Sequence, residues 1–280
     1  MTKRYWSATA VAAVVLFAIP AARGQAQDQK VPRLSNGKPD LSGNWEKPTV
    51  FDMSKDQIGC NVSFRTDCTS VGAHDLSSLY TPFAVAENKK PKLEYTRFCL
   101  PWGYIRAWNA LTPVQLIQNS DNLAILFEQD NWFHVVPTDG RDHPEDVQPT
   151  WYGDSIGKWD GDTLVIDTIG YNGKTWLDTG GQHITTESMH TIERISRPDF
   201  QHLNYEVTII DPKLYTKPWK NTRVFTLMKP GLGLLEYSCN ENNKAAEKGY
   251  RPEILPDEHG GRPPCAAIPN APGCPAAPSK

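Results

Sequence analysis

A predicted β-hairpin carries a histidine, a glutamate and an arginine, residue types that suit acid–base chemistry. Residues 190–196 and 203–210 have the composition of strands and flank the turn formers Arg197-Pro198-Asp199. We expect the register that pairs Ile192 with Val207, because only a register of this parity separates the apolar from the polar side chains.

In this register one face of the hairpin is mostly apolar and carries His190 and Arg194 beside Tyr205. Such a face lines either a packed core or a ligand cavity. If it lines a cavity, His190 acts as a general acid or base, and Arg194 and Tyr205 bind the ligand. Glu193 is then one candidate for the carboxylate that orients the histidine. If the face lines a core, His190 contacts water at the strand end and Arg194 pairs with a carboxylate.

A second candidate site is the charged segment 138–146, which follows a predicted strand and contains Arg141, Asp142 and His143. Loops at strand ends frequently carry ligand contacts. A carboxylate beside an imidazole favours its charged form, so His143 is a candidate catalytic acid or base and Asp142 its orienting group. Arg141 is a candidate ligand-binding residue. The structural alternative is a solvated turn.

A group of histidines and glutamates offers a metal site as a third hypothesis. Its members, His183, Glu187, His190 and Glu193, are separated by four, three and three residues. This spacing aligns side chains only on a helix, whereas the β-branched neighbours favour loop and strand. We therefore predict no metal and no other cofactor, and we assign His183 to ligand binding. Ligands that converge from separate strands are the alternative route to a metal site.

Aromatic residues are concentrated between residues 100 and 180. Most of them are expected to fill a core, while a few that face a cavity would stack on a flat aromatic or sugar-like ligand. Trp151 and Trp176 are our candidates for this second role. The chain has no His-Glu-x-x-His, Walker A or Gly-x-Gly-x-x-Gly motif, which argues against zincins and against nucleotide-binding and dinucleotide-binding proteins.

The elements that position these residues are predicted to be strands. Turn formers group eight strand-like segments into four successive hairpins: 123–128 with 132–137, 155–159 with 163–168, 190–196 with 203–210, and 219–228 with 232–239. Weak helical periodicity occurs near residues 81–89 and 241–248. We therefore predict an all-β, lipocalin-like barrel of the calycin type, antiparallel and up-and-down with short helical segments, because closure removes exposed strand edges.

Composition excludes several classes of protein. Of the 280 residues, 39% are apolar and 22% are charged, which is ordinary for a folded protein and not for a disordered one. The formal net charge of −3 leaves no basic excess to contact phosphates, so we predict no nucleic-acid partner. The oligomeric state does not follow from the sequence.

The chain divides into four parts by composition. Residues 1–26 have the features of a secretory signal, because basic residues precede an apolar stretch that ends in small residues. An uncleaved membrane anchor is the alternative, but the apolar stretch is shorter than the roughly 20 residues that span a bilayer. Residues 27–39 are expected to form a flexible arm, 40–250 a single β-barrel domain, and 251–280 a Pro/Ala-rich tail. We expect a periplasmic or secreted protein without stable membrane insertion.

Six cysteines, an even number in a chain with a predicted export signal, indicate three disulfides. The pairs that we favour among the possible pairings are Cys60 with Cys68, Cys265 with Cys274, and Cys99 with Cys239. The first two would close short loops, and the third would join the start of the core to its last strand. A zinc site is the alternative, but no Cys-x-x-Cys pair occurs in the sequence.

Residues 41–45, Leu-Ser-Gly-Asn-Trp, precede the hairpins and resemble the Gly-x-Trp opening of lipocalin-like barrels. In that family the tryptophan closes one end of the barrel, and the lumen holds a small apolar molecule. The resemblance therefore implies that Trp45 lies at a barrel end and that the interior binds a ligand.

Five further motifs occur at residues 99–101, 139–144, 161–168, 211–219 and 236–242. Through them, more than half of the chain resembles a widespread, largely uncharacterised family of exported bacterial proteins. The chain departs from the family pattern at 102–104 and 182–184, where changes would alter a pocket wall if those segments line one. The resemblance implies export and a bacterial source, and it assigns no catalytic residue.

Together these observations predict an exported lipocalin-like protein that binds a small apolar or aromatic molecule in the barrel lumen. A further hypothesis makes it a cofactor-independent lyase or isomerase that performs acid–base elimination, isomerisation or cyclisation on that molecule. The alternatives are a hydrolase or carbohydrate-active protein, and a non-catalytic carrier or envelope scaffold.

Overall fold

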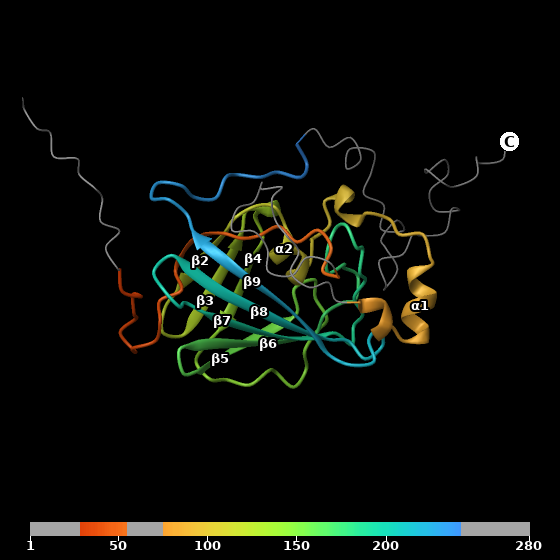
Figure 1. The fold of residues 1–280 in the computed structure, drawn as a ribbon, viewed down its shortest axis with the longest axis horizontal. Coiled ribbons are helices and arrows are strands. Elements are labelled where there is room, and N and C mark those ends of the chain that lie inside the picture. Colours follow the sequence, from red (N-terminus) through yellow and green to blue (C-terminus); the bar gives the residue numbers. More distant parts are fainter. Residues whose placement is uncertain (1–28, 55–74, 242–280) are drawn as a thin grey trace, which may run out of the picture.

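The computed structural model describes residues 29–54 and 75–241 (Figure 1). The strands in these ranges are β1 (Gly43–Glu46), β2 (Val114–Gln118), β3 (Asn122–Phe127), β4 (Phe133–Pro137), β5 (Asp154–Asp160), β6 (Thr163–Ile169), β7 (His190–Ser196), β8 (His202–Ile210) and β9 (Trp219–Leu227). The helices are α1 (Pro82–Asn88) and α2 (Tyr104–Asn109), with 3-10 turns at Leu76–Leu79, Tyr95–Phe98 and Gln129–Asn131. The predicted all-β class is confirmed.

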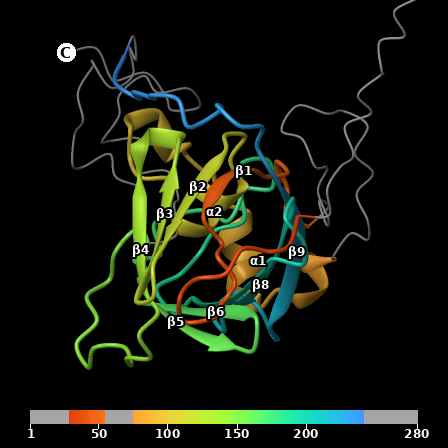
Figure 2. The same ribbon diagram turned by 90° about the vertical axis from the view of Figure 1, so that its left-hand side faces the viewer.

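The strands of this part of the chain form one antiparallel sheet in the order β4-β3-β2-β1-β9-β8-β7-β6-β5. The sheet curls around α2 into a near-barrel (Figure 2). β4 and β5 are the two edges of the sheet, and side chains join them: the His134 ring lies 2.7 Å from the Ser155 hydroxyl. We call this meeting of β4 and β5 the seam. The predicted lipocalin-like barrel is confirmed, with the seam in place of a closing ladder of backbone hydrogen bonds.

Three of the four predicted hairpins are confirmed, as β3–β4, β5–β6 and β7–β8. The fourth is wrong in its second half: residues 219–228 contain β9, but residues 232–239 form no strand. Instead, the Leu235 N–H donates to the Glu128 carboxylate at 2.8 Å, which holds this segment beside the β3–β4 turn. The ladder is completed by β1 and β2, because β1 pairs with both β2 and β9.

The two predicted helical segments have different outcomes. Residues 81–89 contain α1, where the Thr81 hydroxyl accepts a hydrogen bond from the Ala84 N–H and Pro82 occupies the first turn. The segment 241–248 lies outside the described residues except for Glu241.

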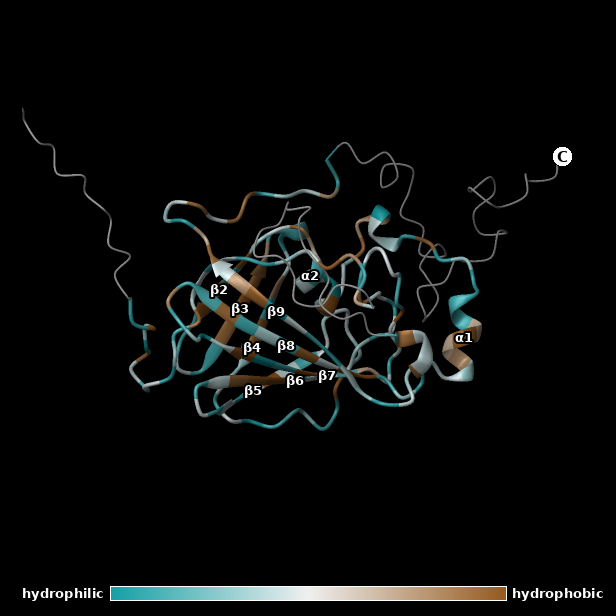
Figure 3. Ribbon diagram, in the orientation of Figure 1, coloured by the Kyte–Doolittle hydropathy of each residue, from teal (hydrophilic) through white to brown (hydrophobic). Residues whose placement is uncertain are grey.

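The core lies between the inner faces of the strands and α2. Apolar and polar residues alternate along the strands (Figure 3), and every residue of α2 is buried. The Trp108 ring on α2 lies with its centroid 5.0 Å from that of Tyr205, 5.3 Å from that of Phe127 and 5.6 Å from that of Phe225. Helix α2 and these aromatic rings therefore occupy the centre of the barrel.

The expected register of the β7–β8 hairpin is wrong by one residue. Glu193 pairs with Val207 and Ile195 with Tyr205, so Ile192 does not face Val207. As a result Glu193 points into the core with Tyr205, while His190 and Arg194 lie on the outer face of the sheet. Residue type is misleading here, because the expected register puts His190 and Arg194 on the apolar face and Glu193 on the polar one. In the structure the Tyr205 hydroxyl donates to Glu193 at 2.6 Å within the core.

A covalent bond joins the segment before α2 to the segment after β9. Cys99 and Cys239 form a disulfide across 140 residues, which confirms this predicted pair. Cys60, Cys68, Cys265 and Cys274 lie outside the described residues, so their pairing stays a prediction.

The segment before β1 contacts the β5–β6 turn. Arg33 forms an ion pair with Asp162, and the Lys38 ammonium lies 5.7 Å from the Trp159 ring centroid. Within residues 29–54 and 75–241, no helix has the length and apolar character needed to cross a membrane.

Candidate functional site

A pocket of about 250 Å³ opens at the seam. Its walls come from β4, from the loop that follows it and from β5. The lining includes His134, Val135, Arg141, Asp142, Asp154 and Ser155. We call it the seam pocket. It brings the predicted segment 138–146 to the edge of the barrel wall, where a ligand would meet both backbone edges and buried side chains.

The inner wall of the seam pocket is a short chain of hydrogen bonds. His134 alternates with exposed Phe133 and Val135 on β4, so its ring turns toward the core. The His134 Nε2 lies 2.7 Å from the Ser155 hydroxyl, which lies 2.7 Å from the hydroxyl of Thr168. Burial lowers the pKa of His134 from 6.5 to about 4. The ring is therefore neutral at pH 7 and offers one nitrogen as a proton acceptor.

Beside the seam pocket one histidine lies between two aspartates, of which Asp154 also lines the pocket. His143 lies between two carboxylates, with Nδ1 2.6 Å from Asp154 and Nε2 3.0 Å from Asp167. The second candidate histidine, His190, places its Nε2 3.0 Å from the same Asp167 oxygen. The structure therefore brings together the two histidines that the sequence singled out 47 residues apart.

The carboxylate that faces each histidine differs from the predicted one. Asp142 forms an ion pair with Lys158 at 2.8 Å and does not orient His143. Arg141 forms an ion pair with Asp139, and it lines the seam pocket from an exposed position. Exposed charges prefer the nearest flexible partner, and sequence spacing does not identify that partner.

Behind the seam pocket lies a fully buried carboxyl group, Glu193. Burial raises its pKa to about 7, against the opposing effects of hydrogen bonding to Tyr205 and Tyr104 and of the Arg223 charge. Among the described residues, neither Glu193 Oε2 nor the Tyr104 hydroxyl has a hydrogen bond of good geometry. The two groups lie beside each other, and each can take part in a further hydrogen bond.

Tyr104 connects this carboxyl group to the seam pocket. Its ring centroid lies 4.7 Å from that of His134, and its hydroxyl lies beside Glu193. A second tyrosine, Tyr171, donates to or accepts from Thr191 on the same inner face of β7 at 2.7 Å. The centre of the barrel therefore holds a polar group surrounded by aromatic rings, a setting that tunes a carboxyl group for proton transfer near neutral pH.

Two predicted ligand-binding residues on the hairpin have different surroundings. Tyr205 is buried and hydrogen-bonded to Glu193, which places it in the interior cluster. Arg194 lies outside the barrel wall and donates to Asp160 on β5 at 2.7 Å. The expectation that Arg194 shares a face with Tyr205 is wrong, because the register differs by one residue.

The two candidate tryptophans pack against the same tyrosine, and neither lines the seam pocket. Both contact Tyr95: Trp151 stacks on its ring at 6.2 Å, and Trp176 meets it edge-on at 5.4 Å. The buried Arg106 guanidinium lies over the same ring and over Trp176, and it donates to Glu94 at 2.8 and 2.9 Å. In this arrangement the rings surround an internal ion pair.

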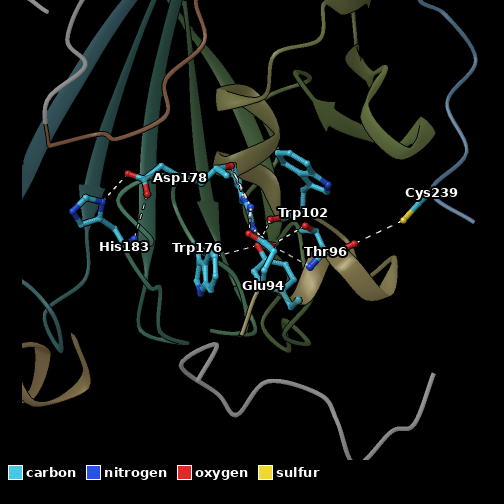
Figure 4. Close-up of polar contacts among 10 residues, drawn as sticks. Glu94, Thr96, Trp102, Trp176, Asp178, His183 and Cys239 are labelled. Atoms are coloured by element: carbon cyan, nitrogen blue, oxygen red, sulfur yellow. Dashed lines mark hydrogen bonds and ion pairs between the residues drawn. The ribbon is translucent and has the colours of Figure 1, made fainter. Parts of the chain in front are cut away.

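The four residues of the hypothetical helix-spaced metal site do not converge. Glu193 faces the interior, His190 lies on the outer face and Glu187 pairs with Lys213. His183 instead contacts the buried Asp178, with Nδ1 2.6 Å from the carboxylate (Figure 4). The reason is that these residues occupy loop and strand, where their spacing does not align them.

The comparison with known proteins adds no assignment. No family model, curated protein or solved structure matches this chain.

Several residues of the site were missed by the sequence analysis, and two of them left a signal. Asp167 lies on β6, where buried Leu164 and Ile166 alternate with it, so period-two alternation places it on the outer face. Ser155 lies within residues 153–157, Gly-Asp-Ser-Ile-Gly, which match the Gly-x-Ser-x-Gly pattern. The match lies at the start of a strand and not on a strand-to-helix turn. His134 and Tyr104 left no comparable signal.

Proposed function

We propose that the protein binds a small apolar or aromatic molecule that enters at the seam pocket and extends past its lining into the barrel interior, where Glu193 transfers a proton on it. The barrel shape is compatible with a ligand-binding lipocalin-like protein. A pocket of about 250 Å³ is at the small end of the roughly 300–1,000 Å³ that ligand pockets span. The ligand is therefore of one- or two-ring size.

The observation that carries this proposal is the buried Glu193 with its pKa raised to about 7. Such a group is close to half ionised at neutral pH, which is the best condition for both accepting and returning a proton. In an isomerisation the carboxylate takes a proton from one carbon and returns it to another, while Tyr104 hydrogen-bonds to the oxygen that gains charge. Electrons and atoms balance within the ligand, so the step consumes no cofactor.

We also propose that the protein acts outside the cytoplasm, in the periplasm or as a secreted protein. The support is the signal-like composition of residues 1–26, the similarity of the motifs to exported bacterial proteins, and the Cys99–Cys239 disulfide. Structural disulfides persist in oxidising compartments and are rare in the cytosol.

Native mass spectrometry of the oxidised protein tests the binding step. The wild type should retain a small molecule, and Val135→Trp, which fills the pocket from an exposed lining position, should lose it by at least about ten-fold. Val85→Trp on α1 is the matched control, because Val85 is equally exposed and far from the pocket lining. Equal retention by Val135→Trp, or no retained molecule in the wild type, would contradict binding at the seam.

The contact between His134 and Ser155 favours a second candidate function, ester or amide hydrolysis. A neutral imidazole 2.7 Å from a serine hydroxyl in a pocket is the arrangement that activates a nucleophile. A fluorophosphonate probe tests it: the probe should add to Ser155 in the wild type and in Ser188→Ala, and not in Ser155→Ala. An unlabelled wild type would exclude this candidate and leave the proton-transfer proposal intact.

A further inference from the structure

Three ligand-type side chains meet at the end of the barrel, away from the seam pocket. Asp52 comes from the segment after β1, and Asp178 and His183 come from the long loop between β6 and β7. One donor atom of each residue lies within 4.8 Å of the other two. Two carboxylate oxygens and one imidazole nitrogen at this separation can share a single cation.

Backbone contacts fix the two segments against each other. The Gly180 N–H donates to the Phe51 carbonyl at 2.5 Å, and the Met53 N–H donates to the Asp178 carboxylate at 2.7 Å. The carboxylates of the two segments are therefore held at a short distance by the main chain. Side-chain flexibility alone would not bring them together.

The loop also places the imidazole ring. The Leu177 N–H donates to the His183 carbonyl at 2.7 Å, which closes the loop. A Cβ at Gly181 would lie 2.3 Å from the His183 ring, so only glycine leaves room for the ring beside Asp178 (Figure 4). Asp178 is fully buried and His183 nearly so.

This cluster accumulates negative charge in a partly desolvated place. Burial, together with the charges of Asp178 and Asp52, raises the pKa of Tyr80 to about 12. Placing two carboxylates this close costs free energy through repulsion and desolvation, unless a proton or a cation offsets it. A divalent ion bound by all three side chains would offset both charges.

We propose that Asp52, Asp178 and His183 bind one divalent transition-metal ion. A set of two oxygens and one nitrogen suits Zn²⁺ or Mn²⁺ better than Ca²⁺, which prefers oxygen ligands only. Three protein ligands leave coordination positions open to water. The ion links the segment after β1 to the β6–β7 loop. This inference is independent of the proposed function at the seam.

Zinc titration of the oxidised, chelator-treated full chain tests the proposal, with a chromophoric chelator as competitor. The wild type should bind one Zn²⁺ with a Kd of about 1 µM or tighter. Asp52→Asn and His183→Ala should each weaken binding by at least about 100-fold, since even outer-shell partners contribute 10–100-fold. Asp52 is only half-buried, so Asp52→Asn tests the site even if His183→Ala fails to fold.

Two control variants separate this site from other histidine–aspartate pairs. His202→Ala removes a surface histidine paired with Asp199, and His143→Ala removes the histidine that contacts Asp154 beside the seam pocket. Both should bind Zn²⁺ as the wild type does. Loss of binding in His143→Ala with retention in Asp52→Asn, or no stoichiometric binding by the wild type, would overturn the proposal.

Discussion

At the level of single residues, the candidate chemical groups are side chains whose pKa values are shifted by burial. Glu193 and His134 are shifted in opposite directions by the same cause, since removal from water disfavours the charged form of each. The result is a carboxyl group that retains a proton near pH 7 and an imidazole that lacks one. Tyr104 contacts both groups, so it links the proton donor Glu193 to the proton acceptor His134.

The raised pKa of Glu193 predicts a loss of stability as the pH rises. The folded state holds the proton up to about pH 7, whereas an unfolded glutamate releases it near 4.5. The free energy of unfolding should therefore fall between these pH values, by roughly 2 to 3 kcal/mol from pH 5 to 8. In Glu193→Gln this contribution disappears.

The measurement is urea denaturation of the wild type and of Glu193→Gln at pH 5 and pH 8. The difference between the two proteins isolates Glu193, because His134 contributes equally to both. His134, whose pKa is lowered, adds stability as the pH rises from about 4 to 6.5, in the opposite sense. Parallel stability curves for the two proteins would contradict a raised Glu193 pKa.

At the level of elements, local sequence signals predicted the hairpins and failed for pairings between distant segments. Turn formers with little chain between two strands identify β3–β4, β5–β6 and β7–β8. β1 pairs with β2 and β9, which lie far away in the sequence, and no local turn announces those pairings. The strand expected at 232–239 has the right composition, but β9 already pairs with β1 on one side and β8 on the other, so it leaves no open edge for another strand.

The candidate site was predicted only in part, because the sequence does not give the register between neighbouring strands. Alternation along β8 correctly places Tyr205 inside. On β7 the alternation misleads, because Glu193 occupies a core position that its charge argues against. His143 and His190 were found by residue type, but Asp167, which joins them, follows only from the alignment of β6 with β7. Side chains that meet across a sheet depend on register, which a one-residue error reverses.

Close packing between β4 and β5 at the seam can be tested by a substitution at Gly157. A Cβ at Gly157 on β5 would lie 2.9 Å from the Thr138 side chain and 3.3 Å from the Pro137 carbonyl. Gly157→Val should therefore lower the free energy of unfolding by about 1–3 kcal/mol through overpacking. Thermal denaturation measures this change.

Lys158→Val is the matched control for Gly157→Val. Lys158 is the next residue on β5, points to solvent and pairs only with exposed Asp142 among its described ion-pair contacts. Its replacement should change stability by no more than about 0.5 kcal/mol. An equal effect of both variants would contradict close packing at the seam.

At the level of the whole molecule, the barrel is held together across its long loops. The Cys99–Cys239 disulfide ties the segment before α2 to the segment after β9. These segments enclose most of the barrel, so the bond restricts the unfolded chain over a long distance. Helix α2 fills the interior, and the seam pocket lies at the wall where the sheet does not close.

Removal of this disulfide should destabilise the protein without changing the sheet. Cys99→Ala with Cys239→Ala is expected to lower the free energy of unfolding by roughly 2–5 kcal/mol. Urea denaturation under oxidising conditions measures the loss, and far-ultraviolet circular dichroism checks that the strands persist. Urea denaturation of the double variant with added reductant measures separately how far disulfides among the remaining cysteines contribute to stability. An unchanged midpoint of denaturation would contradict a stabilising role.

The central claim, that Glu193 transfers a proton on a molecule bound at the seam, is tested most directly by hydrogen exchange into that molecule. The protein with its retained ligand is placed in D₂O, and the released ligand is analysed by mass spectrometry. Wild type should add deuterium at carbon, and Glu193→Gln should slow this by at least about 100-fold. A ligand that is released from the wild type with no deuterium at carbon would contradict the claim and identify the protein as a carrier.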